Sequence, residues 1–482
     1  MNTALRHVWI AIIALFVLVF GALSYIQFFA VKDLNSNPLN TRQLFKNFDL
    51  ARGAILVDGK PIAESVASHD QFDYQRTYAD PKLYSHLTGF YSLTYGANML
   101  EGVMDDELTG QSDSQFYKRM VNMLTGQQDE GASVELTIDP KLQKTAYDLI
   151  PDGQQGTIIV SEPKTGNILA MVSKPSFDTN LLAVHSGAKA SANMAEILKT
   201  QGLSPNINPA TGHLIAPGST FKILDLVAGI ESGKYNLNDQ YENPKSITVP
   251  GAGKPVTNFG EGICANQTRA KLAFIVAQSC NTPFVAMSQA VGQDALRDVT
   301  ERFGFGQQLQ IPLRVTPSSF PTDMDSAQLG LASIGQYDVR ATPLQMNMVA
   351  MGIANDGVIM KPNLVKQVIA PDLSVISQPK PEEFSTATSK DVANQVTELM
   401  RGPLEGGTAY KAKIPGLDIA AKTGTAQLGD GTNRVNSWIT GFAPADDPQV
   451  AVTIVIEKTD YATGHNLTSP NLKKILEAVF NK

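Results

Sequence analysis

Three short motifs follow one another along this chain, and their residue types fit one kind of chemistry. They are Ser219-Thr220-Phe221-Lys222, Ser279-Cys280-Asn281 and Lys422-Thr423-Gly424. A serine with a lysine three positions later indicates acyl transfer to the serine hydroxyl, with an amine rather than an imidazole as the base. We therefore take Ser219 as the candidate nucleophile and Lys222 as its candidate base.

The same letters occur elsewhere in the chain, so the sequence around each motif has to decide. Other matches are Ser161–Lys164, Ser186–Lys189, Ser191–Asn193, Ser204–Asn206, Ser469–Asn471 and Lys164–Gly166. The last of these lies between the apolar runs 157–160 and 167–172, which predicts a hairpin turn. In contrast, apolar residues at helical spacing over 220–230 predict a helix that begins at Ser219. Free N–H groups at a helix N-terminus favour developing negative charge.

Lys222 can act as a base only if its pKa lies far below that of a free lysine, about 10.4. Burial and a second cation nearby would both lower it, and Lys422 is the candidate for that cation. Lys422 and the hydroxyls of Thr423 and Thr425 could also hold a substrate carboxylate. Gly424 would let a substrate backbone lie close to the strand edge. The alternative is a capping serine and an exposed lysine without chemistry.

The middle motif supplies two further polar groups and a cysteine. Ser279 could relay a proton from Lys222 to a leaving amine, and Asn281 could orient Lys222 and a substrate amide. Cys264 and Cys280 predict a disulfide that fixes this loop, if the chain lies outside the cytoplasm. Two buried free thiols are the alternative. Two cysteines without histidines at metal spacing predict no metal site.

Length and composition limit the number of domains and the classes of function that the chain can have. The 482 residues suggest two or three domains. A net charge of -7 gives no basic surface for nucleic acid. The nearly continuous apolar run from Val8 to Phe29 would span about 33 Å, which is enough to cross a bilayer. A cleaved signal peptide is the alternative, although the apolar run continues past the small residues at 21–24.

Local patterns predict the elements that must position these residues. We expect a linker over 35–40, a hairpin over 52–63, an exposed strand over 134–138 and a helix that starts at Asp139-Pro140. Two strands surround the turn at 162–166, and three more cover 419–427, 436–442 and 449–457. A final helix covers 471–480, and the segment 221–355 is mostly helical. Strands from both ends around a helical middle indicate an α+β fold with an antiparallel sheet flanked by helices.

The motifs and their surroundings resemble those of class B penicillin-binding proteins. The matching segments are Pro217–Lys222, Ser279–Thr282, Gly335-Gln336, Thr342–Gln345, Gly407–Ala409, Lys422–Gln427, Trp438 and Gly441–Pro444. Upstream, Asn37-Pro38, Arg42 and Arg52-Gly53 resemble the membrane-proximal domain of that family. The short N-terminal domain is most similar to the actinobacterial penicillin-binding protein A group. One departure is Asn208-Pro209-Ala210, where many members carry an Arg-Ala pair, and this bears on access to the site.

The resemblance implies a cytoplasmic tail (1–7), a transmembrane anchor (8–30), a β-rich pedestal or dimerisation-like domain (31–138) and a transpeptidase domain (139–482) with a five-stranded antiparallel sheet. It implies a single-pass membrane protein whose catalytic domain lies outside the cytoplasm. The expected partners are peptidoglycan stem peptides, β-lactam inhibitors, the cytoplasmic membrane and proteins of the division or elongation machinery. No cofactor, metal or nucleic acid is expected.

The implied activity is D,D-transpeptidation, which cross-links stem peptides through an acyl-enzyme on Ser219. The backbone N–H groups of Ser219 and Thr425 would form the oxyanion hole, by analogy with the family. Two alternatives remain open. A β-lactamase of the same superfamily would need a group that activates water, and a scaffold or β-lactam sensor would need no turnover at all.

Overall fold

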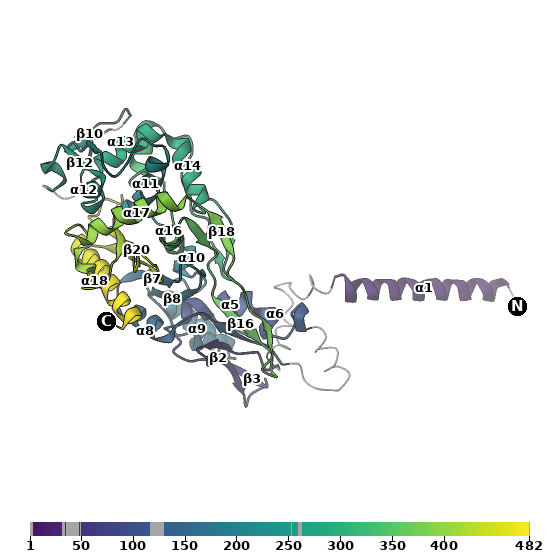
Figure 1. The fold of residues 1–482 in the computed structure, drawn as a ribbon. Coiled ribbons are helices and arrows are strands. Elements are labelled where there is room, and N and C mark those ends of the chain that lie inside the picture. Colours follow the sequence, from purple (N-terminus) through teal and green to yellow (C-terminus); the bar gives the residue numbers. More distant parts are fainter. Residues whose placement is uncertain are drawn as a thin grey trace.

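Our computed structural model describes residues 3–30, 34, 48, 50–115, 130–251, 253–258 and 263–481. The predicted linker 35–40 and Arg42 lie outside the described residues. Helix α1 (Thr3–Phe28) is long and apolar enough over Leu5–Phe28 to cross a membrane, and its side chains there are exposed. Figure 1 shows α1 as a single helix apart from the folded remainder. Such a uniformly apolar exposed helix suits lipid rather than water.

A six-stranded sheet organises the N-terminal part of the structure. Its order is β17-β16-β6-β1-β2-β3. The strands are β1 (Ile55–Val57), β2 (Lys60–Ala67), β3 (Tyr74–Tyr78), β6 (Ser133–Leu136), β16 (Val365–Ile369) and β17 (Val375–Ser377). The predicted hairpin is confirmed as β1 and β2, which pair in antiparallel fashion around Asp58 and Gly59, both at positive φ. This is the conformation that an Asp-Gly hairpin turn needs.

Two strands of this sheet come from far along the sequence. β16 pairs with β6 in antiparallel fashion, while β6 runs parallel to β1. The prediction of a strand at 134–138 is therefore right, but its predicted exposure is wrong, because β6 is an internal strand. Val134 and Leu136 are buried, and the Glu135 carboxylate accepts hydrogen bonds from Lys366 and Gln367. The sheet thus combines chain from both sides of the predicted domain boundary.

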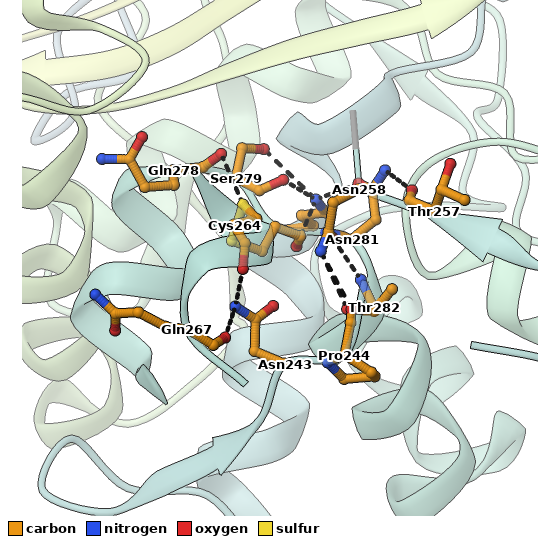
Figure 2. The surroundings of a disulfide bond; sticks show 12 residues. Asn243, Pro244, Thr257, Asn258, Cys264, Gln267, Gln278, Ser279, Asn281 and Thr282 are labelled. Carbon is orange, nitrogen blue, oxygen red and sulfur yellow. Dashed lines mark hydrogen bonds between the residues drawn. A yellow bond between two sulfur atoms is a disulfide. The ribbon is translucent and has the colours of Figure 1, made fainter. Parts of the chain in front are cut away.

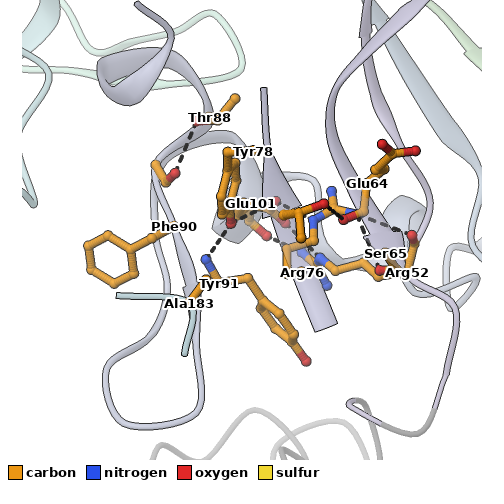
Figure 3. A network of polar contacts seen from close by, with 12 residues as sticks. Arg52, Glu64, Ser65, Arg76, Tyr78, Thr88, Phe90, Tyr91, Glu101 and Ala183 are labelled. Atoms are coloured by element: carbon orange, nitrogen blue, oxygen red, sulfur yellow. Dashed lines mark hydrogen bonds and ion pairs between the residues drawn. The ribbon is translucent and has the colours of Figure 1, made fainter. Parts of the chain in front are cut away.

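A buried charge network holds the N-terminal part together (Figure 3). Glu101 accepts hydrogen bonds from Arg52 Nε at 2.7 Å, Arg76 Nε at 2.7 Å and the Tyr78 hydroxyl at 3.1 Å. Burial acts to raise the pKa of Glu101, but the charges of Arg76 and Arg52 keep that pKa below its usual value. Removing one partner of such a network leaves an uncompensated buried charge and costs about 3–5 kcal/mol.

The C-terminal part is built on a five-stranded antiparallel sheet of order β19-β20-β21-β7-β8. Its strands are β7 (Gln155–Ser161), β8 (Ile168–Lys174), β19 (Ala420–Gln427), β20 (Val435–Ala443) and β21 (Val450–Thr459). The predicted hairpin and the three predicted C-terminal strands are confirmed. Alternate residues face opposite layers, so that Ile158 packs with α8 and α18 while Ile159 packs with the helical middle.

Helices lie on both faces of this sheet, and further helices lie beyond it (Figure 1). They are α8 (Pro140–Asp148), α9 (Gly187–Ile197), α10 (Pro209–Gly212), α11 (Lys222–Glu231), α12 (Leu272–Ala277), α13 (Thr282–Val291), α14 (Gln293–Arg302), α15 (Ser326–Ala332), α16 (Pro343–Ala354), α17 (Lys390–Arg401) and α18 (Tyr461–Phe480). In Figure 1 the helices α11 to α14 gather at one end of the molecule, and β2 and β3 lie at the other. Asp139 caps α8 by accepting from the Leu142 N–H, as predicted.

Short elements complete the fold. The N-terminal part adds α4 (Ser85–Thr88), α5 (Met99–Val103), α6 (Asp105–Leu108), β4 (Tyr91–Ser92) and β5 (Gly96–Ala97). Paired two-stranded ribbons are β9 (Gln240–Glu242) with β12 (Arg269–Lys271), β10 (Ser246–Ile247) with β11 (Val256–Thr257), β13 (Leu309–Gln310) with β14 (Arg314–Val315), and β15 (Val358–Met360) with β18 (Glu383–Thr386).

The last helix is longer than the sequence predicts. α18 begins at Tyr461 rather than at 471, and Asp460 caps it by accepting from the Thr463 N–H at 3.0 Å. Gly464 and Pro470 in the sequence suggest a break, yet both lie inside the helix. A side chain on Gly464 would meet Ser437 Cβ at 2.5 Å, so this glycine allows α18 to pack closely on β20.

Candidate active site

The candidate nucleophile lies on a tight turn before helix α11. Residues Gly218–Thr220 form a 3-10 turn, and Ser219 is half-buried at its centre. Gly218 has φ 55°, and a Cβ on it would lie 2.6 Å from the carbonyl oxygen of Thr425. Its N–H donates to the carbonyl of Gly335 at 3.0 Å. The turn is therefore held between strand β19 and the turn at Gly335.

A cleft of about 950 Å³ opens beside this turn. It is lined by six of the predicted site residues: Ser219, Ser279, Asn281, Thr423, Gly424 and Thr425. The other two predicted catalytic residues, Lys222 and Lys422, are fully buried. The fold thus brings all three motifs to one place, although they are far apart in the sequence.

Lys222 lies within hydrogen-bonding distance of the Ser279–Asn281 motif. Its Nζ donates to Asn281 Oδ1 at 2.8 Å and to the carbonyls of Ser279 and Cys280 at 2.9 and 3.1 Å. Burial, and then the charge of Lys422, place the pKa of Lys222 well below its usual value, against the opposing charge of Asp225. Among the described residues, Lys222 forms no hydrogen bond with Ser219.

Lys422 approaches the same serine from strand β19. Its Nζ donates to Ser279 Oγ at 2.7 Å and to the Thr423 carbonyl at 3.0 Å. Burial lowers the pKa of Lys422 to about 7. Ser279 Oγ also lies 3.5 Å from Lys222 Nζ, so this hydroxyl stands between two buried amines. A shared hydroxyl of this kind can pass a proton from one amine towards a reacting group.

Ser279 itself has a strained backbone. Its φ is 57°, a left-handed conformation that is uncommon for a non-glycine residue. The turn is fixed by Asn258, whose Oδ1 accepts from the N–H groups of Asn281 and Thr282 at 2.6 and 3.1 Å. Asn281 Nδ2 donates to the Thr257 carbonyl at 3.0 Å. Figure 2 shows these contacts beside the disulfide of Cys280.

Strand β19 forms one wall of the cleft. It is the edge strand of its sheet, with β20 as its neighbour. Thr423 Oγ1 donates to Thr408 Oγ1 at 2.6 Å. Gly424 has a packing role that the sequence does not predict. A Cβ at this position would lie 3.0 Å from the Thr220 nitrogen and 2.8 Å from the Pro217 carbonyl oxygen. The missing side chain lets the strand approach the nucleophile turn.

Comparisons with known proteins identify the family. Residues 156–477 match the penicillin binding protein transpeptidase domain, and residues 52–134 match the penicillin binding protein A dimerisation domain. Peptidoglycan D,D-transpeptidase PbpA of Mycolicibacterium smegmatis is 38% identical over 98% of this chain and 97% of that protein. The chain is a class B penicillin-binding protein.

Solved structures agree with this assignment of the penicillin-binding protein. The imipenem acyl-enzyme of penicillin-binding protein A from M. tuberculosis has a TM-score of 0.85 and 35% identity, covering 90% of this chain and 100% of that one. The penicillin G acyl-enzyme of the same protein has a TM-score of 0.84 and 36% identity, covering 89% and 100%. The resemblance seen in the sequence is therefore confirmed.

Several cleft residues of this penicillin-binding protein escape sequence reasoning. Asn258, Tyr337 and His465 line the cleft from three separate elements. No local motif marks Asn258 or His465, whereas Tyr337 directly follows the Gly335-Gln336 pair that resembles the family. Only the tertiary fold brings the three to the cleft that Ser219 lines. The segment Asn208-Pro209-Ala210, where the sequence departs from the family pattern, is not among the residues that line the cleft. Asn208 is buried, and its Nδ2 donates to the His86 carbonyl at 2.6 Å, so it joins the N-terminal part to the transpeptidase part.

The predicted disulfide between Cys264 and Cys280 is present, and no free cysteine remains. We expect Cys264→Ala/Cys280→Ala to lower the free energy of unfolding by about 3 kcal/mol, because the unfolded chain loses its cross-link. Denaturant unfolding of both proteins measures this difference.

Thiol labelling of unreduced, denatured protein exported to an oxidising compartment should find no free thiol, and two labelled cysteines would contradict the bridge.

Proposed function

We propose that Ser219 is the nucleophile of this D,D-transpeptidase and attacks the penultimate D-alanine carbonyl of a stem peptide. The observation that carries this proposal is the pair of buried amines, Lys222 and Lys422, on either side of Ser279 Oγ in the cleft that Ser219 lines. The Ser219 oxygen forms the acyl bond, the peptide C–N bond breaks, and D-alanine leaves. An amine of a neighbouring stem peptide then takes the acyl group and frees Ser219.

In this proposal Lys222 takes the proton of Ser219 Oγ. Its burial favours the neutral amine, which has two N–H donors and one lone pair. A neutral amine can donate to only two of the three acceptors at 2.8–3.1 Å. In this proposal it donates to the two nearest, Asn281 Oδ1 and the Ser279 carbonyl, and not to the Cys280 carbonyl. The lone pair is then left to accept a proton. Ser279 passes this proton to the leaving amine, and Asn281 holds Lys222 in place.

The negative charge that develops on the attacked carbonyl oxygen would be stabilised by the backbone N–H groups of Ser219 and Thr425. This part of the proposal is supported by the contact of Gly218 with Thr425, which places β19 against the nucleophile turn. Preorganised N–H donors of this kind are worth about 10²–10³ in rate. The terminal carboxylate of the substrate is assigned to the hydroxyls of Thr423 and Thr425, which line the cleft, with Lys422 beneath them.

We further propose that α1 anchors the protein in the cytoplasmic membrane, with residues 1–7 inside, 31–138 as a pedestal and the transpeptidase domain 139–482 outside. The disulfide supports an oxidising, extracytoplasmic location. There the enzyme would meet its stem peptides and the proteins of the division or elongation machinery. Protease treatment of intact spheroplasts should degrade the catalytic part, and its protection would contradict this topology.

The decisive experiment is mass spectrometry after penicillin treatment. We expect a long-lived adduct on the peptide that contains Ser219 and no adduct on Ser161 or Ser186, the serines of two other Ser-x-x-Lys matches. Ser219→Ala should abolish the adduct. Rapid drug hydrolysis without an adduct would favour a β-lactamase. A trapped adduct without turnover of a stem-peptide substrate would favour a sensor or scaffold.

A further inference from the structure

Tyr337 has an unusual combination of backbone strain and exposure. Its φ is 56°, and its side chain remains 42% exposed on the wall of the cleft that contains Ser219. A bulky aromatic residue in the left-handed region is a genuine outlier. Such strain persists where the surroundings impose it, and it gathers at functional sites. Because the ring is not buried, packing in the free protein does not account for it.

The turn that carries Tyr337 is firmly held. The Gln336 N–H donates to the Leu331 carbonyl at 3.0 Å, at the end of α15. Arg340 Nη1 donates to the carbonyls of Tyr337 and Val339 at 2.9 and 3.0 Å. The Gly335 carbonyl accepts from Gly218, directly before the nucleophile. The backbone that carries the ring is therefore held by hydrogen bonds and joined to the nucleophile turn.

Apolar residues near Tyr337 in the sequence line the same cleft, alongside the polar Gln328 and Gln336. Leu331, which is 37% exposed, and Ile334 line the same cleft beside it. A leucine and an aromatic ring that remain open in a cleft of this size are typical of a site that receives an apolar group. Thr423 and Thr425 of β19 also line this cleft.

The nucleophile turn lies between these two surfaces. Gly218 contacts Thr425 on β19 and hydrogen-bonds to Gly335 on the Tyr337 turn. If the leaving group with its carboxylate lies along β19, the group on the other side of the scissile carbonyl faces the Tyr337 turn. We infer that Tyr337 packs against the apolar side chain on the acyl side of the substrate or β-lactam, and so determines selectivity among acyl donors. This inference rests on the proposed function.

The test compares two ligands that differ only in that side chain. Benzylpenicillin carries a phenylacetyl amide, and 6-acetamidopenicillanic acid keeps the amide but lacks the ring. If Tyr337 packs on the ring of the bound ligand, Tyr337→Asn should lower the ratio of their acylation rate constants by about three- to tenfold. Tyr337→Phe should preserve the ratio. Asparagine tolerates positive φ, so the melting temperature of Tyr337→Asn should not fall.

Leu373→Asn is the matched control. Leu373 also has positive φ (68°) and is 83% exposed, but it lies between β16 and β17 and does not line the cleft. This variant makes the same kind of backbone change and should leave the ratio unaltered. An unchanged ratio in Tyr337→Asn, or an equal loss for both ligands, would overturn the inference. If Tyr337→Asn does not fold, Tyr337→Gly, which is free at positive φ, gives the same comparison.

The experiment also separates this inference from the proposed function. Wild-type protein that neither ligand acylates on Ser219 would refute the proposed function, and the inference with it. Acylation of Ser219 by both ligands, with a ratio that does not respond to residue 337, would refute the inference alone.

Discussion

Replacing Lys222 by alanine will slow the acylation of Ser219 by penicillin about 10²- to 10⁴-fold, the range expected when a general base is lost. Lys222 is the only titratable side chain among the described residues that hydrogen-bonds to both Ser279 and Asn281, next to the nucleophile turn. The nearby Lys422 already donates to Ser279 and Thr423. Stopped-flow or gel-based acylation kinetics with a reporter penicillin measure the loss.

Two further variants make this result specific. Lys222→Met keeps the buried aliphatic chain and removes the amine, so it should fold and show the same loss. Lys164→Ala changes the lysine of another Ser-x-x-Lys match, which is exposed and pairs with Asp447 at 2.6 Å. It should acylate at the wild-type rate. A folded Lys222 variant that acylates at nearly the wild-type rate would show that another group is the base.

Replacing Lys422 by alanine should slow the acylation of Ser219 about 10- to 100-fold at pH 7, which is the range expected for a lost charge-assisted hydrogen bond. The loss of rate should be smaller at pH 9. The pKa of Lys422 is lowered to about 7, so its charge is present at low pH and absent at pH 9. While charged, Lys422 lowers the pKa of Lys222. Without that charge, Lys222 holds its proton to higher pH, and the acid limb of the rate profile moves up.

The measurement is the acylation rate of Lys422→Ala with one β-lactam at several pH values. Lys164→Ala is again the control, since it changes the lysine of the second Lys-Thr-Gly sequence. An equal fold loss at pH 7 and pH 9 would contradict any role of the Lys422 charge and leave the amine as an uncharged hydrogen-bonding anchor for the carboxylate. Weaker binding of acidic ligands is expected under both roles.

The strands of the catalytic sheet were predictable because their signals are local. The hairpin of β7 and β8 has two apolar runs around a turn, and the three C-terminal strands each have clear boundaries. The start of α18 was missed because Gly464 and Pro470 look like helix breakers when their packing is unknown. The internal position of β6 was missed because its neighbour β16 comes from more than 200 residues later.

The candidate site likewise has features that the sequence predicts and features that only the structure shows. Its three motifs are short and ordered, so the sequence identifies the residues that carry them and predicts two lysines near one serine. The sequence cannot show that Ser279 Oγ lies between the two amines, that Ser279 has positive φ, or that Asn258 supports the turn. These features depend on contacts between segments that are remote along the chain.

The shared six-stranded sheet has a mechanical consequence. Strand β6 hydrogen-bonds to β1 on one side and to β16 on the other, and β16 follows closely after α16 in the chain. Helix α16 is buried throughout and packs on β7, β20 and β21. The six-stranded sheet and the catalytic sheet are therefore connected through β16 and α16. We expect a displacement of the six-stranded sheet to reach the strands that present Lys422 and its neighbours.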